Sequence, residues 1–312
     1  MWHILLVSKV IQGGIFMPDV TRLIGHTPLV RLKCGIFVKL EGMNPGGSAK
    51  DRVALSMIDN AQHRGILSPG GTIIEPTSGN TGVGLAMVAA ARGYKCILVM
   101  PDSMSIERRR LLTAYGAQVV LVDGALGMAG CVKKAEEIQR ATTNSIIAGQ
   151  FVNPANPAAH YASTGPEIWA DTDGQADIFV AGIGTGGTIT GVGRFLKEQN
   201  PSIRIVGVEP AASPLLTEGH AGPHPLQGIG ANFVPEILDL SIVDEIIPVT
   251  GEDAFAQTRS LAREEGILAG ITSGAAVWAA KQLAQRPEYA GKTIVALLPD
   301  SGERYLSTGI FD

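Results

Sequence analysis

The sequence predicts an α/β protein with two open, twisted, mostly parallel β-sheets and helices on both faces of each sheet. Three observations indicate this fold. A short aliphatic segment, a glycine-rich turn and an amphipathic segment follow one another repeatedly along the chain, an order typical of parallel sheets covered by helices. The 39 glycines suit many tight turns. The 312 residues are also enough for two such units.

The first half of the chain contains one set of alternating elements. Strands are expected where β-branched and aliphatic residues dominate, and helices where apolar residues recur every three to four positions. Gly93 and Gly116 each follow an expected helix and are typical of a helix C-terminus. The expected strands cover residues 72–74, 95–100, 118–122 and 145–148, and the expected helices begin near Val53 and cover 81–92, 106–115 and 126–141.

A second set of elements follows the proline-containing segment 153–157, which we interpret as a crossing between two domains. Thr250 is expected to cap a helix that has Asp253 at its third position. The expected strands cover 178–181, 203–208 and 293–298, and the expected helices cover 188–198, 251–265 and 274–284. We therefore expect an extension at 1–16, a smaller mobile domain at 38–153, and a larger domain built from 17–37 and 154–312.

Composition excludes several classes of function. The net charge is −4 and no basic patch is present, so neither nucleic acid nor an anionic membrane is an expected partner. The uninterrupted apolar run near the N-terminus is too short to span a bilayer. The cysteines Cys34, Cys96 and Cys131 lie far apart, without the spacing of metal ligands. We expect no metal, a cytoplasmic location, and free thiols that pack in the core.

Lys50 is the first candidate catalytic residue. It ends the run Asn-Pro-Gly-Gly-Ser-Ala-Lys that starts at Asn44, directly before an expected helix. Most lysines lie in solvent, but burial at a helix start, together with the positive end of the helix dipole, lowers the pKa of a lysine. The free amine then becomes available for Schiff-base chemistry on an aldehyde.

The loop at 76–82, with the sequence Pro-Thr-Ser-Gly-Asn-Thr-Gly, is a candidate anion site. It follows an expected strand and precedes an expected helix. Some of its hydroxyl and amide groups are expected to cap that helix. The loop has more small polar groups than a cap requires, which favours an additional role in binding a substrate carboxylate.

The glycine-rich segment 182–188 also lies between an expected strand and an expected helix. Its exposed backbone amides and the helix dipole would bind a phosphate without any Lys or Arg. Gly182, Gly184 and Gly187 also match the dinucleotide motif G-x-G-x-x-G, with Glu209 as the ribose-binding acid. A nicotinamide-dependent dehydrogenase is therefore an alternative. That alternative leaves Lys50 without a role, and the motif lies in the second half of the chain.

Taken together, the motifs resemble the cysteine synthase (O-acetylserine sulfhydrylase) family. These enzymes depend on pyridoxal 5'-phosphate and have fold type II, which is similar to the tryptophan synthase β-subunit. The resemblance runs from about Thr21 to Gly309. The matching motifs are those at 44–52 and 76–82, Gly-Thr-Gly-Gly-Thr at 184–188, and Thr-Ser-Gly-Ala-Ala at 272–276.

The resemblance implies a role for each site residue. Lys50 would form a Schiff base with the cofactor aldehyde, and Asn80 would bind the ring hydroxyl. Thr272 would face the ring nitrogen at a position that is usually serine, with Ser273 as the second choice. A neutral hydroxyl does not hold that nitrogen protonated, which favours β-elimination over transamination. The phosphate would be held by Gly184, Thr185, Gly186, Gly187 and Thr188, and the substrate carboxylate by Thr77, Ser78, Gly79, Asn80, Thr81 and Gln150.

The implied reaction is synthesis of L-cysteine from O-acetyl-L-serine and sulfide, with Lys50 as the general base. One alternative is a lyase of the cystathionine β-synthase or serine dehydratase type. Dehydratases usually have Phe-Lys-x-Arg, which Ala49-Lys50-Asp51-Arg52 does not match, and the chain has no room for regulatory or haem-binding regions. Another is a non-catalytic relative that binds serine acetyltransferase, against which the intact motifs argue. The family also implies a homodimer.

Overall fold

The computed structural model describes residues 10–11, 14–15 and 17–312. Most of the expected extension at 1–16 lies outside the described residues. Within it, β1 (Val10–Ile11) and β2 (Gly14–Ile15) pair in an antiparallel arrangement. No helix in the described part of the chain combines the length and the hydropathy needed to cross a membrane.

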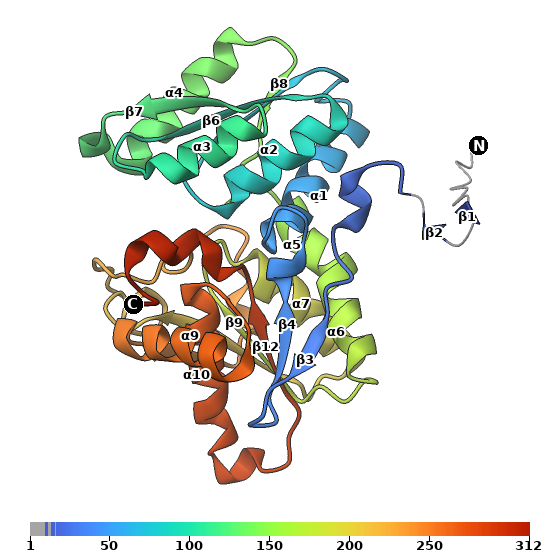
Figure 1. The fold of residues 1–312 in the computed structure, drawn as a ribbon, viewed down its shortest axis with the longest axis vertical. Helices are drawn as coiled ribbons and strands as arrows, with labels where there is room; N and C mark the ends of the chain where they lie inside the picture. The colour runs from blue at the N-terminus through green and yellow to red at the C-terminus, as the bar shows by residue number, and fades with distance from the viewer. Residues whose placement is uncertain (1–9, 12–13, 16) are drawn as a thin grey trace.

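A four-stranded, fully parallel sheet forms a smaller unit, which lies above the larger one in Figure 1. Neighbouring residues Ile73 and Ile74 point to opposite faces, and both are buried by helices. The strand order is β7 (Gln118–Val122), β6 (Lys95–Pro101), β5 (Thr72–Pro76) and β8 (Ser145–Ile147). The helices are α1 (Lys50–His63), α2 (Asn80–Arg92), α3 (Ile106–Ala114) and α4 (Gly127–Ala141).

A six-stranded sheet forms the larger unit. All its neighbouring strands are parallel except the pair at one edge, β3 and β4. The order is β11 (Glu245–Val249), β10 (Arg204–Pro210), β9 (Ile178–Gly182), β12 (Ile294–Leu298), β4 (Phe37–Leu40) and β3 (Leu29–Arg31). The helices are α5 (Ala155–Ala159), which continues as a π-helical turn at His160–Thr164, α6 (Gly165–Asp171), α7 (Gly187–Gln199), α8 (Leu215–Glu218), α9 (Gly251–Glu265) and α10 (Ile271–Ala284).

The observed sheets confirm the expected fold class, but some elements differ from the expectation. Helix α1 begins at Lys50 rather than near Val53. Residues 38–40 were expected in the smaller domain, yet β4 pairs with β12 of the larger sheet, with Val38 opposite Ala296. Residues 155–157 of the proline-containing crossing belong to α5, which packs against both α1 and α7.

The cysteines follow the expectation only in part. Cys96 and Cys131 are buried, as expected for core residues, and all three thiols are free. Cys34 is exposed, so its expected packing in the core is wrong. It lies in the tight turn between β3 and β4, where the Gly35 amide donates to the Leu32 carbonyl at 2.9 Å. Side chains in such a turn point into solvent.

Candidate active site

Lys50 is held where the two units meet. The carbonyl of Pro299, directly after β12, accepts a 2.8 Å hydrogen bond from the Ala49 amide, so the residue before Lys50 is tied to the larger sheet. Burial lowers the pKa of Lys50, and the negative charges of Asp300 and Glu41 partly oppose that shift. The amine therefore loses its proton more easily than an ordinary lysine does.

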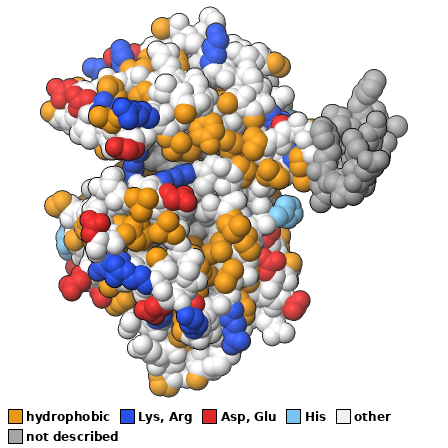
Figure 2. All heavy atoms as spheres, viewed as in Figure 1, with side chains coloured by type: hydrophobic (Ala, Val, Ile, Leu, Met, Phe, Trp, Pro, Cys, Tyr) orange, Lys and Arg blue, Asp and Glu red, His pale blue; other side chains and the backbone are white. Residues whose placement is uncertain are grey.

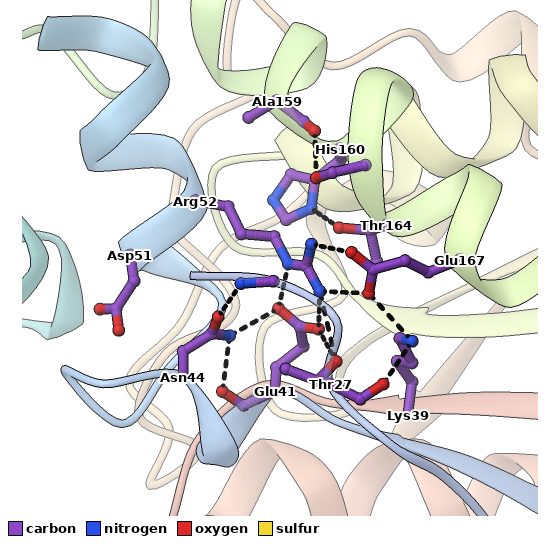
Figure 3. Close-up of polar contacts among 12 residues, drawn as sticks. Thr27, Lys39, Glu41, Asn44, Asp51, Arg52, Ala159, His160, Thr164 and Glu167 are labelled. Carbon is purple, nitrogen blue, oxygen red and sulfur yellow. Dashed lines mark hydrogen bonds and ion pairs between the residues drawn. The ribbon is translucent and has the colours of Figure 1, made fainter. Parts of the chain in front are cut away.

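A buried ionic network anchors helix α1, which begins at Lys50 (Figure 3). Arg52 Nε donates to Glu41 at 2.7 Å, and Arg52 Nη1 donates to Glu167 of α6 at 2.6 Å. Lys39 of β4 lies 3.0 Å from the same Glu167 carboxylate. Burial alone would raise the pKa of Glu167, but the hydrogen bond and charge of Arg52 lower it to about 2. The network thus joins the helix of Lys50 to the larger unit.

The cavity beside Lys50 contains most of the expected phosphate-binding residues. Gly186 has φ +83° and directly precedes α7. A Cβ at Gly184 would lie 2.3 Å from the Gly228 carbonyl oxygen, so a side chain there cannot fit. The loop therefore presents bare backbone to the cavity at the start of a 13-residue helix, which suits a phosphate group. Lys50 lines this cavity together with Gly184, Thr185, Gly186, Thr188 and Thr272.

Two side chains that the sequence did not single out support this loop from behind. The Asn156 amide donates to Thr185 Oγ1 at 3.0 Å, and a Cβ at Gly187 would lie 1.9 Å from Asn156 Oδ1. His160 Nε2 lies 3.2 Å from Thr188 Oγ1. Burial and the nearby positive charge of Lys50 lower the pKa of His160 well below its usual range. Asn156 lies in the domain crossing and His160 follows it, and in the sequence only their polar character beside alanines and prolines could have identified them.

Only some of the residues expected to bind the substrate carboxylate line a second cavity, and Thr77, Thr81 and Gln150 do not. Ser78, Gly79 and Asn80 line this cavity, which has a volume of about 490 Å³ and is bordered by α3 and by the 3-10 helix Gly302–Thr308. Figure 2 shows an indentation between the two units, with basic and acidic side chains at its rim. Thr81 lies deeper and donates to Gln150 Oε1 at 2.5 Å, which joins the loop to the segment after β8.

Asn80 is held by residues near the C-terminus of the chain. Its amide nitrogen donates to Asp300 at 2.7 Å, and its oxygen accepts a hydrogen bond from Arg304. The Tyr305 hydroxyl donates to the same Asp300 carboxylate at 2.6 Å. Burial raises the pKa of Asp300, and its hydrogen bonds and the charge of Lys50 act in the opposite direction. Asp300 therefore holds Asn80 by a hydrogen bond, and its negative charge also acts on the pKa of Lys50.

The structure distinguishes the two candidates for the ring-nitrogen partner by position. Thr272 borders the Lys50 cavity and donates to the Gln227 carbonyl at 3.0 Å. The neighbouring Ser273 hydroxyl is buried and has no hydrogen-bond partner among the described residues.

Glu209, the acid that the dehydrogenase alternative needs, is already engaged. Its carboxylate accepts hydrogen bonds from the amides of Leu216 at 2.9 Å and Thr217 at 3.1 Å, at the start of α8. Both oxygens of this carboxylate are thus already used to cap a helix. The geometry therefore argues against a dinucleotide site.

Comparison with known proteins agrees with this geometry. The family model described as pyridoxal-phosphate dependent enzyme matches residues 20–300. The chain belongs to this family. Among its relatives, cysteine synthase A of Escherichia coli K12 is 54% identical over 301 residues, which cover 92% of this chain and 93% of that protein. The expected family and cofactor are thus confirmed, and the nicotinamide alternative is excluded.

Two solved structures have the same fold. Cysteine synthase from Entamoeba histolytica superimposes with a TM-score of 0.92 at 43% identity, covering 95% of this chain and 91% of that one. A chain named O-ureido-L-serine synthase superimposes with a TM-score of 0.91 at 46% identity, covering 95% and 96%. The two-sheet arrangement of the family is therefore present in full.

Proposed function

We propose that the protein synthesises L-cysteine from O-acetyl-L-serine and sulfide. The observation that carries the proposal is the position of Lys50, whose pKa is lowered by burial, in one cavity with the glycine loop that precedes α7. The high identity to cysteine synthase A over nearly the whole chain supports the same reaction.

The cofactor is expected to bind in the Lys50 cavity. Pyridoxal phosphate, when bound, supplies an electron sink for the negative charge that develops at the substrate α-carbon. Among the residues of the chain, Lys50 would hold its aldehyde carbon and Asn80 its ring hydroxyl. Thr272 would face the ring nitrogen with a neutral hydroxyl. The phosphate would be held by Gly184, Thr185, Gly186, Gly187 and Thr188.

The substrate carboxylate is expected at the loop after β5. Thr77, Ser78, Gly79, Asn80 and Thr81 would bind it together with Gln150. The Thr81–Gln150 hydrogen bond supports this role, because it brings the two parts of the proposed site into contact. Movement of the smaller unit toward the larger one would then exclude water from the reacting carbon.

Lys50 is the proposed general base. Its Nζ would take the α-proton of the substrate as the β-carbon–oxygen bond breaks and acetate leaves. Sulfide then forms the new carbon–sulfur bond at the β-carbon, and Lys50 returns the proton to the α-carbon. The balanced result is O-acetyl-L-serine plus hydrosulfide (HS−) giving L-cysteine plus acetate.

The test uses purified protein loaded with pyridoxal phosphate. O-acetyl-L-serine plus sulfide should yield L-cysteine, and borohydride reduction followed by peptide mapping should place the pyridoxyl group on Lys50. A parallel assay with serine plus homocysteine tests the lyase alternative, and O-phosphoserine tests the choice of donor. Absence of cysteine from the first pair, with product from the second, would replace the proposal with the lyase.

Further proposals concern the cellular location of the enzyme and its assembly. We propose a cytoplasmic homodimer that can bind serine acetyltransferase, in line with the family resemblance. The free thiols of the chain are typical of a reducing compartment. Sedimentation equilibrium of the protein alone, and then with an acetyltransferase, measures both associations.

A further inference from the structure

Glu75 is a buried carboxylate with no ionic partner among the described residues. Only 1% of its surface is exposed, and it lies on β5 two positions before Thr77. Its two oxygens accept hydrogen bonds from the backbone amides of Gly149 at 2.7 Å and Gln150 at 3.2 Å. These contacts join the end of β5 to the turn that follows β8.

This contact suits an anion with two oxygens. Gly149 has φ +72°, and its amide and that of Gln150 donate to the two oxygens of one carboxylate, as successive amides in an anion-binding turn do. A neutral side chain would present fewer acceptors to the two donors. The carboxylate is nevertheless costly to bury. Burial raises the pKa of Glu75 to about 7, although the two amides act in the opposite direction.

Gln150 connects both halves of the proposed site. Its side chain accepts the hydrogen bond from Thr81, and its backbone carbonyl accepts one from Asn156 at 2.8 Å. The same Asn156 amide donates to Thr185 of the phosphate loop. The position of Gln150 therefore affects the proposed carboxylate site and the proposed phosphate site together.

We propose that Glu75 is a positioning residue for Gln150, and that its ionised carboxylate is needed for tight binding of the amino-acid substrate. The proposal deepens, and rests on, the cysteine synthase function proposed above. Loss of the negative charge would free the Gly149 and Gln150 amides, so that the Gln150 side chain would no longer be held against Thr81.

The surroundings of Glu75 contain few other titratable groups. On β6 they are the buried thiol of Cys96, whose pKa is raised to about 12 by burial and by the charge of Glu75, and the exposed Lys95. Strand β8 has none, and Arg92 of α2 donates to Thr21. On α4 the charged residues, at positions 133, 134, 136, 137 and 140, are exposed, and burial raises the pKa of the Cys131 thiol. A pH effect on the Gln150 turn is thus assigned to Glu75.

The experiment compares the cofactor-loaded wild type with Glu75→Gln. Calorimetry with L-serine measures binding directly, from pH 6 to pH 8.5. We expect the wild type to bind more tightly as the pH rises through 7, and Glu75→Gln to bind about 10- to 100-fold more weakly at pH 8, without that pH step. The KM for O-acetyl-L-serine should rise similarly, whereas kcat and the KM for sulfide should change little.

The matched control is Glu209→Gln. Glu209 is also buried, with 2% exposed, and also accepts two backbone amide hydrogen bonds, but it lies on β10 and its carboxylate contacts the start of α8. This control should bind L-serine like the wild type. If Glu75→Gln does not fold, Glu75→Asp keeps the charge and should retain the pH step with weaker binding.

The outcomes separate this proposal from the reaction itself. If Glu75→Gln binds L-serine with the affinity and the pH dependence of the wild type, the positioning role is overturned, whichever reaction the enzyme catalyses. A wild type that binds L-serine with the Glu75-dependent pH step but makes no cysteine would instead overturn the proposed function and leave the positioning role standing.

Discussion

The guanidinium of Arg52 and the carboxylate of Glu167 face each other with two hydrogen bonds, of 2.6 and 2.7 Å. Arg52 lies two residues after Lys50, and Glu167 belongs to α6 of the larger unit. Paired bonds of this kind define orientation as well as distance. The contact therefore sets the direction in which α1 leaves the active site (Figure 3).

Replacing Arg52 should strongly destabilise the protein. Arg52→Met leaves the fully buried Glu41 carboxylate without its cation, which costs about 3–5 kcal/mol. Arg52→Lys keeps the charge but not the paired geometry, so we expect a smaller loss. Urea unfolding measures both. Arg194→Met is the control, because its bond to Asp239 is solvent-exposed and should contribute at most about 1 kcal/mol. Equal losses in the free energy of unfolding for Arg52→Met and Arg194→Met would contradict the proposed importance of the buried network.

A methyl group at Gly187 should weaken cofactor binding. The Gly187→Ala side chain would overlap Asn156 Oδ1 and displace the loop that is proposed to hold the phosphate. We expect the dissociation constant for pyridoxal phosphate to rise at least about tenfold, as measured by absorbance titration. Gly193→Ala, in the same helix, is the control, because its Cβ would come no closer than 3.0 Å to Ile242 and 3.3 Å to Ile205, so its overlap is much smaller. Weakening by both variants alike would point to α7 as a whole rather than to the loop.

Removal of the Glu209 carboxylate should affect stability and leave the cofactor in place. Glu209→Ala loses the acceptor for the two amides that begin α8, at a cost of about 1–2 kcal/mol in the free energy of unfolding. Affinity for pyridoxal phosphate should be that of the wild type. A large loss of cofactor in this variant would show that the acid has a role in the site.

The three thiols should differ in reactivity. Cys34 is exposed, whereas Cys96 is buried and its pKa is raised to about 12, first by burial and then by Glu75. The thiolate is the reactive form, so an aromatic disulfide reagent should modify one thiol quickly in the native protein and all three after denaturation. Cys34→Ser should remove the fast phase. A fast phase that persists in this variant would mean that a buried thiol becomes accessible.

The stability of the protein should depend on pH through Glu75. Its pKa is about 7 in the folded protein against an ordinary value of 4.5. Between these two values the folded state binds more protons than the unfolded state, so the free energy of unfolding falls as the pH rises. Glu75→Gln should remove up to about 3 kcal/mol of this decrease. Urea unfolding of both proteins at pH 5 and pH 8 tests the sign. If the free energies of unfolding of the wild type and Glu75→Gln differ by the same amount at pH 5 and at pH 8, the raised pKa of Glu75 is contradicted.

The sequence alone predicted the local elements well where the signals are short-range. The helix Gly251–Glu265 has the expected bounds, and its cap Thr250 accepts from the Asp253 amide at 3.1 Å. Glycines that must end helices, such as Gly93 at φ +72°, are equally local. Strands β3, β4 and β11 were not expected, because β3 and β4 are short and β11 contains a proline.

The motifs also determined the chemistry, since Lys50, the loop at 76–82 and the glycine loop each have a recognisable composition. Only the tertiary structure decided which side chains support them. Glu75, Asn156 and Asp300 act across contacts between residues that are distant along the chain, 75 and 74 positions apart in the case of Glu75. A buried polar side chain is defined by its partner in space, and neither residue type nor local periodicity encodes that partner.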